Sequence, residues 1–176
     1  MKFDIARQPL IPAFMTLFAL AVAAMCAGIP VPDTSGAVRE ALPLLGGQLA
    51  RFQAAYPVWS KFAAGFMLLF AGMCTGRISI RYNLYTVGTC LPIPLYAIVA
   101  CGIATGENYL AGFAASMLLA LATKNYCRAF CNGYGFDAIF RASLYLGLMP
   151  LVYAPALPLL LLLPLAVLLF RRTFRE

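Results

Sequence analysis

The chain contains no histidine, and only 11% of its 176 residues carry a charge. Without histidine, a Ser-His-Asp triad cannot form, and the sequence lacks the imidazole ligand on which most catalytic zinc sites depend. Acidic residues are scarce, and no long apolar run of the chain contains a pair of carboxylates that would suit a proton relay. We therefore expect a protein that is not an enzyme, and we predict no cofactor and no metal.

The scarcity of charge also argues against a water-soluble domain. Hydrophobic residues make up 63% of the chain, and its mean hydropathy is +0.86. Soluble domains are about 45–50% apolar and about 25% charged. The composition therefore predicts an all-α transmembrane bundle that forms one domain over residues 1–176.

Six cysteines are present. Four of them lie within or at the ends of apolar runs, where cysteine behaves as a small apolar residue: Cys26, Cys74, Cys90 and Cys101. Cys127 and Cys131 have a helical spacing of four, which would suit a shared metal or a redox pair. With no histidine and no second cysteine pair nearby, we do not expect a zinc site. The orientation predicted below places both cysteines on the cytoplasmic side, where the reducing environment argues against a structural disulfide.

Apolar runs long enough for spanning helices recur along the chain. A spanning helix needs roughly 17–25 residues. The first run is longer than the apolar core of a signal peptide, so we interpret it as a helix that stays in the protein. We predict about six spanning helices, over residues 10–30, 58–76, 84–103, 109–123, 136–153 and 156–170.

The longest segment between predicted spans covers residues 31–57. Leu42, Leu45, Leu49 and Phe52 recur at intervals of three to four, which predicts short amphipathic helices on the extracytoplasmic side. This segment either forms a lid over a cavity or packs as a structural loop, and we favour packing. Most tyrosines, together with Trp59, lie near predicted helix ends, where aromatic side chains anchor helices at the membrane surface.

Glycine and proline predict the shapes of two spans. Gly65, Gly72 and Gly76 share one helix face, which indicates close packing against neighbouring helices. Pro92 and Pro94 fall inside the predicted helix 84–103, so we expect a kink there. Simple kinks are commoner than the broken helices that line transporter sites.

The basic residues predict the orientation. With six helices, ten of the thirteen Lys and Arg residues lie on the side of the N-terminus, and the opposite side holds only Arg39, Arg51 and Lys61. The ten are Lys2, Arg7, Arg77, Arg81, Lys124, Arg128, Arg141, Arg171, Arg172 and Arg175. Because positive residues accumulate in cytoplasmic loops, we predict that both termini are cytoplasmic.

The polar stretch from Lys124 to Arg141 holds the candidate site. Asp137 and Arg141 stand four residues apart in the order that favours an ion pair on a helix. One interpretation is an inward-facing polar site for an anionic head group or substrate, formed by Arg128, Asp137 and Arg141, to which Lys124 adds charge. The other, which we favour, is an ion pair that stabilises a helix end at the membrane surface.

The last third of the chain carries a family pattern. Phe136-Asp137-Ala138, Ser143-Leu144-Tyr145, Pro155-Ala156-Leu157 and the closing Phe170-Arg171-Arg172-Thr173-Phe174-Arg175-Glu176 resemble a family of polytopic bacterial inner-membrane proteins known only as a domain of unknown function. The resemblance covers residues 83–176. It implies a cell-envelope setting and supplies no catalytic residues. Members of that family continue past the position of Glu176, so the resemblance implies that this chain corresponds to their N-terminal half.

These patterns lead to two functional hypotheses. The first is a multi-pass inner-membrane protein that acts as a non-enzymatic subunit or scaffold of a cell-envelope assembly. Its partners would be the lipid bilayer and either another membrane protein or a second copy of the chain, and nucleic acid is not expected. The alternative is a carrier or enzyme that handles a lipid-linked or anionic envelope substrate at the cytoplasmic face.

Overall fold

The computed structural model of the chain describes residues 10–26, 43–82, 90–104, 108–131 and 135–169. These residues form helices and no strand, which confirms the predicted all-α class. The elements in chain order are α1 (Leu10–Cys26), α2 (Leu44–Ala55), α3 (Pro57–Arg81), α4 (Pro92–Ala104), α5 (Tyr109–Cys131), α6 (Phe136–Val152), the 3-10 helix η1 (Ala154–Leu161) and α7 (Leu162–Leu169).

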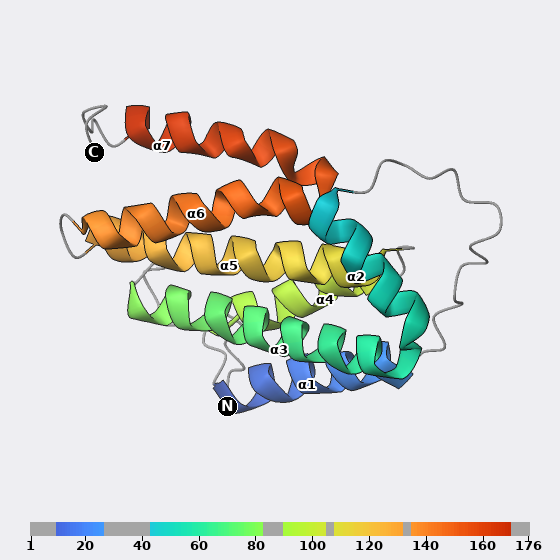
Figure 1. Cartoon of the computed structure of the whole chain (residues 1–176). Coiled ribbons are helices and arrows are strands. Elements are labelled where there is room, and N and C mark those ends of the chain that lie inside the picture. The colour runs from blue at the N-terminus through green and yellow to red at the C-terminus, as the bar shows by residue number, and fades with distance from the viewer. Residues whose placement is uncertain (1–9, 27–42, 83–89, 105–107, 132–134, 170–176) are drawn as a thin grey trace, which may run out of the picture.

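The helices lie side by side and run in alternating directions (Figure 1). One end of the bundle holds the start of α1, the ends of α3 and α5, the start of α6 and the end of α7. We call this the basic end, defined by Arg77, Arg81, Lys124, Arg128 and Arg141. At the opposite end, α2 crosses the bundle obliquely, and we call this the capped end.

Helix α5 lies at the centre of the bundle and packs on α2, α3, α4 and α6. One core cluster joins it to α1, α3 and α4 through Phe113, and another joins it to α6 and η1 through Leu146. Its buried face is rich in alanine, and such small side chains let neighbouring helices approach closely. Among its described side chains, only Thr123, Lys124 and Arg128 are exposed.

The three glycines of α3 lie at helix contacts, as predicted. A β-carbon at Gly65 would collide with the side chain of Met25 on α1, and one at Gly76 would collide with Ile93 on α4. At Gly72 it would meet Leu17 of α1 and stand close to a ring carbon of Tyr96 of α4. Glycine at these positions therefore lets side chains of α1 and α4 lie directly against the α3 backbone.

Among the described helices, α3 alone is both long and apolar enough to cross a membrane. Its 25 residues extend about 37 Å, which exceeds the bilayer hydrocarbon thickness of about 30 Å. Three further apolar helical segments are shorter, at Leu10–Ala23, Pro92–Gly102 and Ala154–Leu165. Residues 27–30 of the first predicted span and residue 170 of the last lie outside the described residues.

The end expected for the second span was wrong. That span was predicted to end at Gly76, but α3 continues to Arg81. Gly76 does not end the helix because it serves a packing contact, and Ile78 and Ser79 beyond it are buried.

The predicted kink at Pro92 and Pro94 is also wrong, because α4 begins at Pro92. Both prolines therefore lie in the first turn, where a missing backbone N–H costs no intrahelical hydrogen bond. Cys90 and Leu91 precede the helix, and residues 84–89 lie outside the described residues.

The last predicted span is built from two kinds of helix. It begins as the 3-10 helix η1 and becomes α-helical only at Leu162, although a continuous α-helix was expected from residue 156. Pro155 lies in the first turn, where a missing N–H costs no hydrogen bond, whereas Pro158 lies inside the helix, where a regular α-helix would lose one. Helix α5 extends past the predicted span of residues 109–123, to Cys131.

The segment before α3 contains a packed helix. Residues 31–42 lie outside the described residues, but α2 contacts α3, α5 and α6. A β-carbon at Gly46 would collide with the carbonyl oxygen of Val152, so α2 and the end of α6 touch at the backbone. Leu49 packs against two core clusters, whereas Leu45 and Phe52 of the predicted apolar face are exposed. Helix α2 therefore forms part of the bundle.

Candidate functional site

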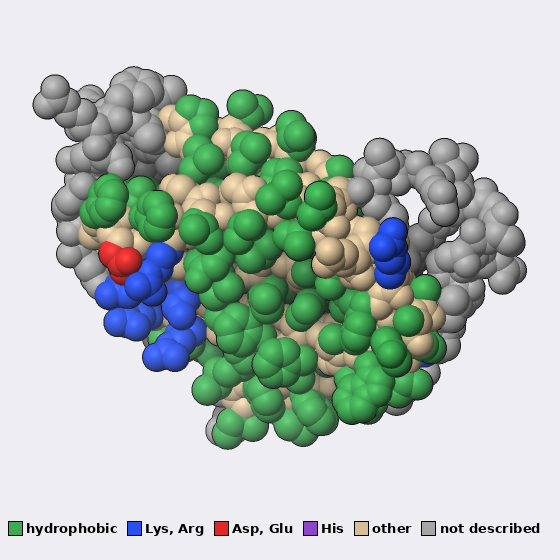
Figure 2. Space-filling model, in the orientation of Figure 1, with side chains coloured by type: hydrophobic (Ala, Val, Ile, Leu, Met, Phe, Trp, Pro, Cys, Tyr) green, Lys and Arg blue, Asp and Glu red, His purple; other side chains and the backbone are tan. Residues whose placement is uncertain are grey.

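The basic end brings together all the residues of the candidate site. Arg128 lies in the last turn of α5, Asp137 in the first turn of α6, and Arg141 one turn later. Figure 2 shows Lys and Arg side chains gathered there next to a single acidic group, beside a broad apolar surface. Asp137 is the one carboxylate side chain in the part of the chain that the structure describes.

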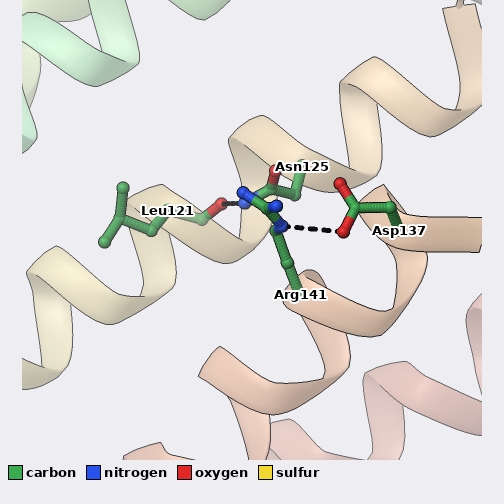
Figure 3. Close-up of polar contacts among 4 residues, drawn as sticks. All are labelled: Leu121, Asn125, Asp137 and Arg141. Carbon is green, nitrogen blue, oxygen red and sulfur yellow. Dashed lines mark hydrogen bonds and ion pairs between the residues drawn. The ribbon is translucent and has the colours of Figure 1, made fainter. Parts of the chain in front are cut away.

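The ion pair forms as the spacing predicts. Arg141 Nε donates to Asp137 Oδ1 over 2.9 Å, and the two side chains are 60% and 66% exposed, respectively. Figure 3 shows that this bond stays within α6, and that Asn125 of α5 donates to the Leu121 carbonyl of its own helix. The pair therefore projects from the surface, and both interpretations of it, a polar site and a stabilised helix end, stay predictions.

Two arginines of α3 also lie at the basic end. In the sequence they contributed only to the predicted orientation. Arg77 and Arg81 stand four residues apart on α3, and Lys124 and Arg128 stand four residues apart on α5. Helices α3 and α5 pack against each other and both end at the basic end, where Figure 2 shows the Lys and Arg side chains in one cluster. No pattern along the sequence predicts which cations of separate helices will lie close together.

At the capped end, polar groups are buried and paired. The hydroxyl of Ser60 is fully buried, donates to the carbonyl of Pro57 and lies 2.5 Å from the hydroxyl of Tyr109. Because the single Ser60 proton is directed at Pro57, Tyr109 donates to Ser60. Nearby, the side-chain carbonyl of Gln53 accepts a hydrogen bond from the Leu110 backbone N–H over 3.3 Å, which caps α5 from α2.

Two tyrosines predicted to anchor the protein at the membrane surface instead lie inside the bundle. Tyr109 is buried against Ser60, as described above. The Tyr96 hydroxyl lies 3.2 Å from the hydroxyl of Ser116, which itself donates to Phe113. Tyr56 is exposed, as an anchor would be. Tyr85 and Tyr134 lie outside the described residues.

A shallow apolar groove follows the junction of α2 and α3. It is lined by Phe52, Tyr56, Trp59, Phe62, Ala63 and Phe66. The groove has almost no polar surface, so it offers no groups for acid–base or nucleophilic chemistry. Within the described parts of the chain, the Ser79 hydroxyl is the one buried side-chain polar atom without a hydrogen-bond partner.

The side chains that could bind a metal ion were not predicted to form a site. The described residues contain no group of three or more side chains that would hold a metal ion. The side chain of Cys131 lies outside them, so the interpretation of Cys127 and Cys131 as a pair stays untested.

No protein-family model, no curated protein and no solved structure matches the chain. The resemblance of residues 83–176 to an uncharacterised inner-membrane family therefore stays a prediction.

Proposed function

We propose that the chain is a multi-pass inner-membrane protein with six spans and both termini in the cytoplasm. In this proposal α1, α3, α4, α5, α6 and the η1–α7 unit each cross the bilayer. The protein acts as a non-enzymatic subunit or scaffold of a cell-envelope assembly, in which its exposed helix faces contact lipid and partner helices.

The observation that carries this proposal is the distribution of exposed side chains. Large apolar residues are exposed on α1, α3, α4, α6, η1 and α7, including four of the phenylalanines Phe62, Phe66, Phe136 and Phe140 at more than half their surface. The described cations lie at the two ends, five at the basic end and Arg51 and Lys61 at the other (Figure 2). Soluble proteins rarely expose apolar patches of this extent, whereas a lipid-facing bundle requires them.

The topology is tested by reporter fusions. Alkaline phosphatase, active only outside the cytoplasm, and green fluorescent protein, fluorescent only inside, are fused after Arg81, Tyr56, Gly135 and Tyr153. We expect fluorescence from the fusions after Arg81 and Gly135 and phosphatase activity from those after Tyr56 and Tyr153. Phosphatase activity after Arg81, or full release of the protein by alkaline carbonate, would reject the proposed topology.

The scaffold role is supported by how the interior is packed. Most of the core is alanine, leucine and aromatic side chains. Its hydroxyl groups form two pairs, Ser60 with Tyr109 and Tyr96 with Ser116. A carrier or an enzyme acting in the membrane would need polar groups facing a cavity. Apart from the Ser79 hydroxyl, the buried side-chain polar atoms of the described residues are hydrogen-bonded within the bundle.

The alternative is a carrier or enzyme for a lipid-linked or anionic substrate, and the exposed cations of the basic end favour it. The two functions are separated by what stays bound after purification in mild detergent. A scaffold retains a stoichiometric membrane-protein partner, which the variant Arg128→Gln/Arg141→Gln keeps as well as the control Arg51→Gln does. A substrate handler retains a lipid-linked glycan that the first variant loses and the control keeps.

A further inference from the structure

The basic end continues directly into an exposed apolar stripe on α3. Phe66, Phe70, Met73 and Arg77 follow one another at intervals of four, three and four residues, so they share one helix face. All four are exposed in part, Phe66 at 67% and Phe70 and Met73 at 38% each. A charged head and an apolar stripe thus lie on one continuous surface.

The length of the stripe matches half a bilayer. Eleven residues separate Phe66 from Arg77, which corresponds to about 16 Å along the helix. One leaflet contributes about 15 Å of the hydrocarbon thickness. An acyl chain whose head group meets Arg77 would therefore end near Phe66.

The helix dipoles explain only some of the cations at the basic end of the stripe. Cations in the last turn of a helix are favoured by its dipole, and this accounts for Arg81 on α3 and Arg128 on α5. It does not account for Arg77 and Lys124, which lie one turn earlier. Asp137 pairs with Arg141, and Arg77, Arg81 and Lys124 have no carboxylate partner among the described residues.

We propose that Arg77, Arg81 and Lys124 bind the phosphodiester head group of an anionic phospholipid whose acyl chain lies along Met73, Phe70 and Phe66. Arginine and lysine clusters at the cytoplasmic surface attract anionic lipids, and the apolar stripe selects an amphiphile over a free anion. This inference rests on the proposed membrane placement and adds the class of lipid that the basic end recognises.

The test measures lipid binding to the full chain purified in an uncharged maltoside detergent, by native mass spectrometry and by thermal shift. The probes are phosphatidylglycerol, phosphatidylcholine with the same acyl chains, and glycerophosphoglycerol, which is the head group without acyl chains. The variant Arg77→Gln/Arg81→Gln/Lys124→Gln is compared with Arg51→Gln/Lys61→Gln from the opposite end. The single variant Lys124→Gln is used if the triple variant does not fold.

We expect at least tenfold tighter binding of phosphatidylglycerol than of phosphatidylcholine, with a loss of about fivefold for each cation removed. The opposite-end variant keeps the preference, and glycerophosphoglycerol does not compete. Equal binding of the two lipids, an equal loss in the opposite-end variant, or effective competition by glycerophosphoglycerol would overturn the inference. Reporter fusions on the same variants separate this failure from failure of the proposed topology, because the topology stands when the fusion after Arg81 stays fluorescent and the fusion after Tyr56 keeps phosphatase activity.

Discussion

The capped end and the basic end of the bundle are held in different ways. At the capped end, α2 touches the backbone of α6 at Gly46, caps α5 through Gln53, and lies beside the buried pair of Ser60 and Tyr109. At the basic end, the one described ion pair is exposed and stays within a single helix. The comparison indicates that polar contacts join separate helices at the capped end, whereas the described ion pair at the basic end joins none.

The sharpest way to break this comparison is to push α2 away from α6. In Gly46→Ala, the added β-carbon meets the Val152 carbonyl oxygen, a backbone atom that cannot rotate away. We expect the free energy of unfolding to fall by about 1–3 kcal/mol, measured by thermal unfolding in detergent.

The matched control is Gly147→Ala, where nothing stands within 4 Å of the new β-carbon. Alanine favours a helix over glycine by about 1 kcal/mol, so this variant is expected to be unchanged or more stable. Equal behaviour of the two alanine variants would show that the contact between α2 and α6 does not matter.

A second prediction concerns the buried hydroxyl pair. Ser60→Ala leaves the donor of Tyr109 buried without an acceptor, whereas Tyr109→Phe leaves Ser60 still donating to Pro57. We expect Ser60→Ala to cost more, with a coupling energy of about 0.6 kcal/mol and at most about 1.7 kcal/mol between the two sites. A double-mutant cycle with the two single variants and their combination measures it.

Thr123→Ala serves as the control for that cycle, because its exposed hydroxyl bonds only to Leu119 of its own helix. It should change stability by less than Ser60→Ala does. Strictly additive effects of the Ser60 and Tyr109 substitutions would mean that the hydrogen bond contributes nothing.

A third prediction tests the cap on α5. Gln53→Leu removes the acceptor for the Leu110 N–H while keeping a side chain of similar size. We expect a loss of about 0.5–1.5 kcal/mol. The rate of amide hydrogen exchange in the first turn of α5 should rise in this variant. An unchanged rate there would argue against a capping role.

The smallest effect is expected at the basic end. Asp137→Ala and Arg141→Ala remove an exposed ion pair, and such pairs on helices contribute about 0.3–0.5 kcal/mol. Both single variants and the double variant should therefore fold to normal abundance. Loss of folded protein in each single variant, with recovery in the double variant, would instead make this ion pair a structural element of the fold.

Local patterns along the chain predicted some features correctly and others incorrectly. The helix of residues 136–152, the contact glycines of α3 and the ion pair of Asp137 with Arg141 depend on spacings within one segment. The proline kink and the end at Gly76 were wrong because the same residue types serve two purposes. A proline starts a helix or bends it, and a glycine ends a helix or seats a neighbour, and only the surrounding packing distinguishes these uses.

The amino-acid sequence by itself determined the helical class and the segregation of charge to segment ends, because composition and helical periodicity act over a few turns. Only the tertiary structure decided that Tyr109 is buried against Ser60, that Gln53 caps a helix 57 residues away, and that Arg77 and Lys124 lie at the same end of the bundle. Those pairings depend on which faces of distant helices pack together. That choice is made by the collective fit of small and large side chains in the core, and no single segment encodes it.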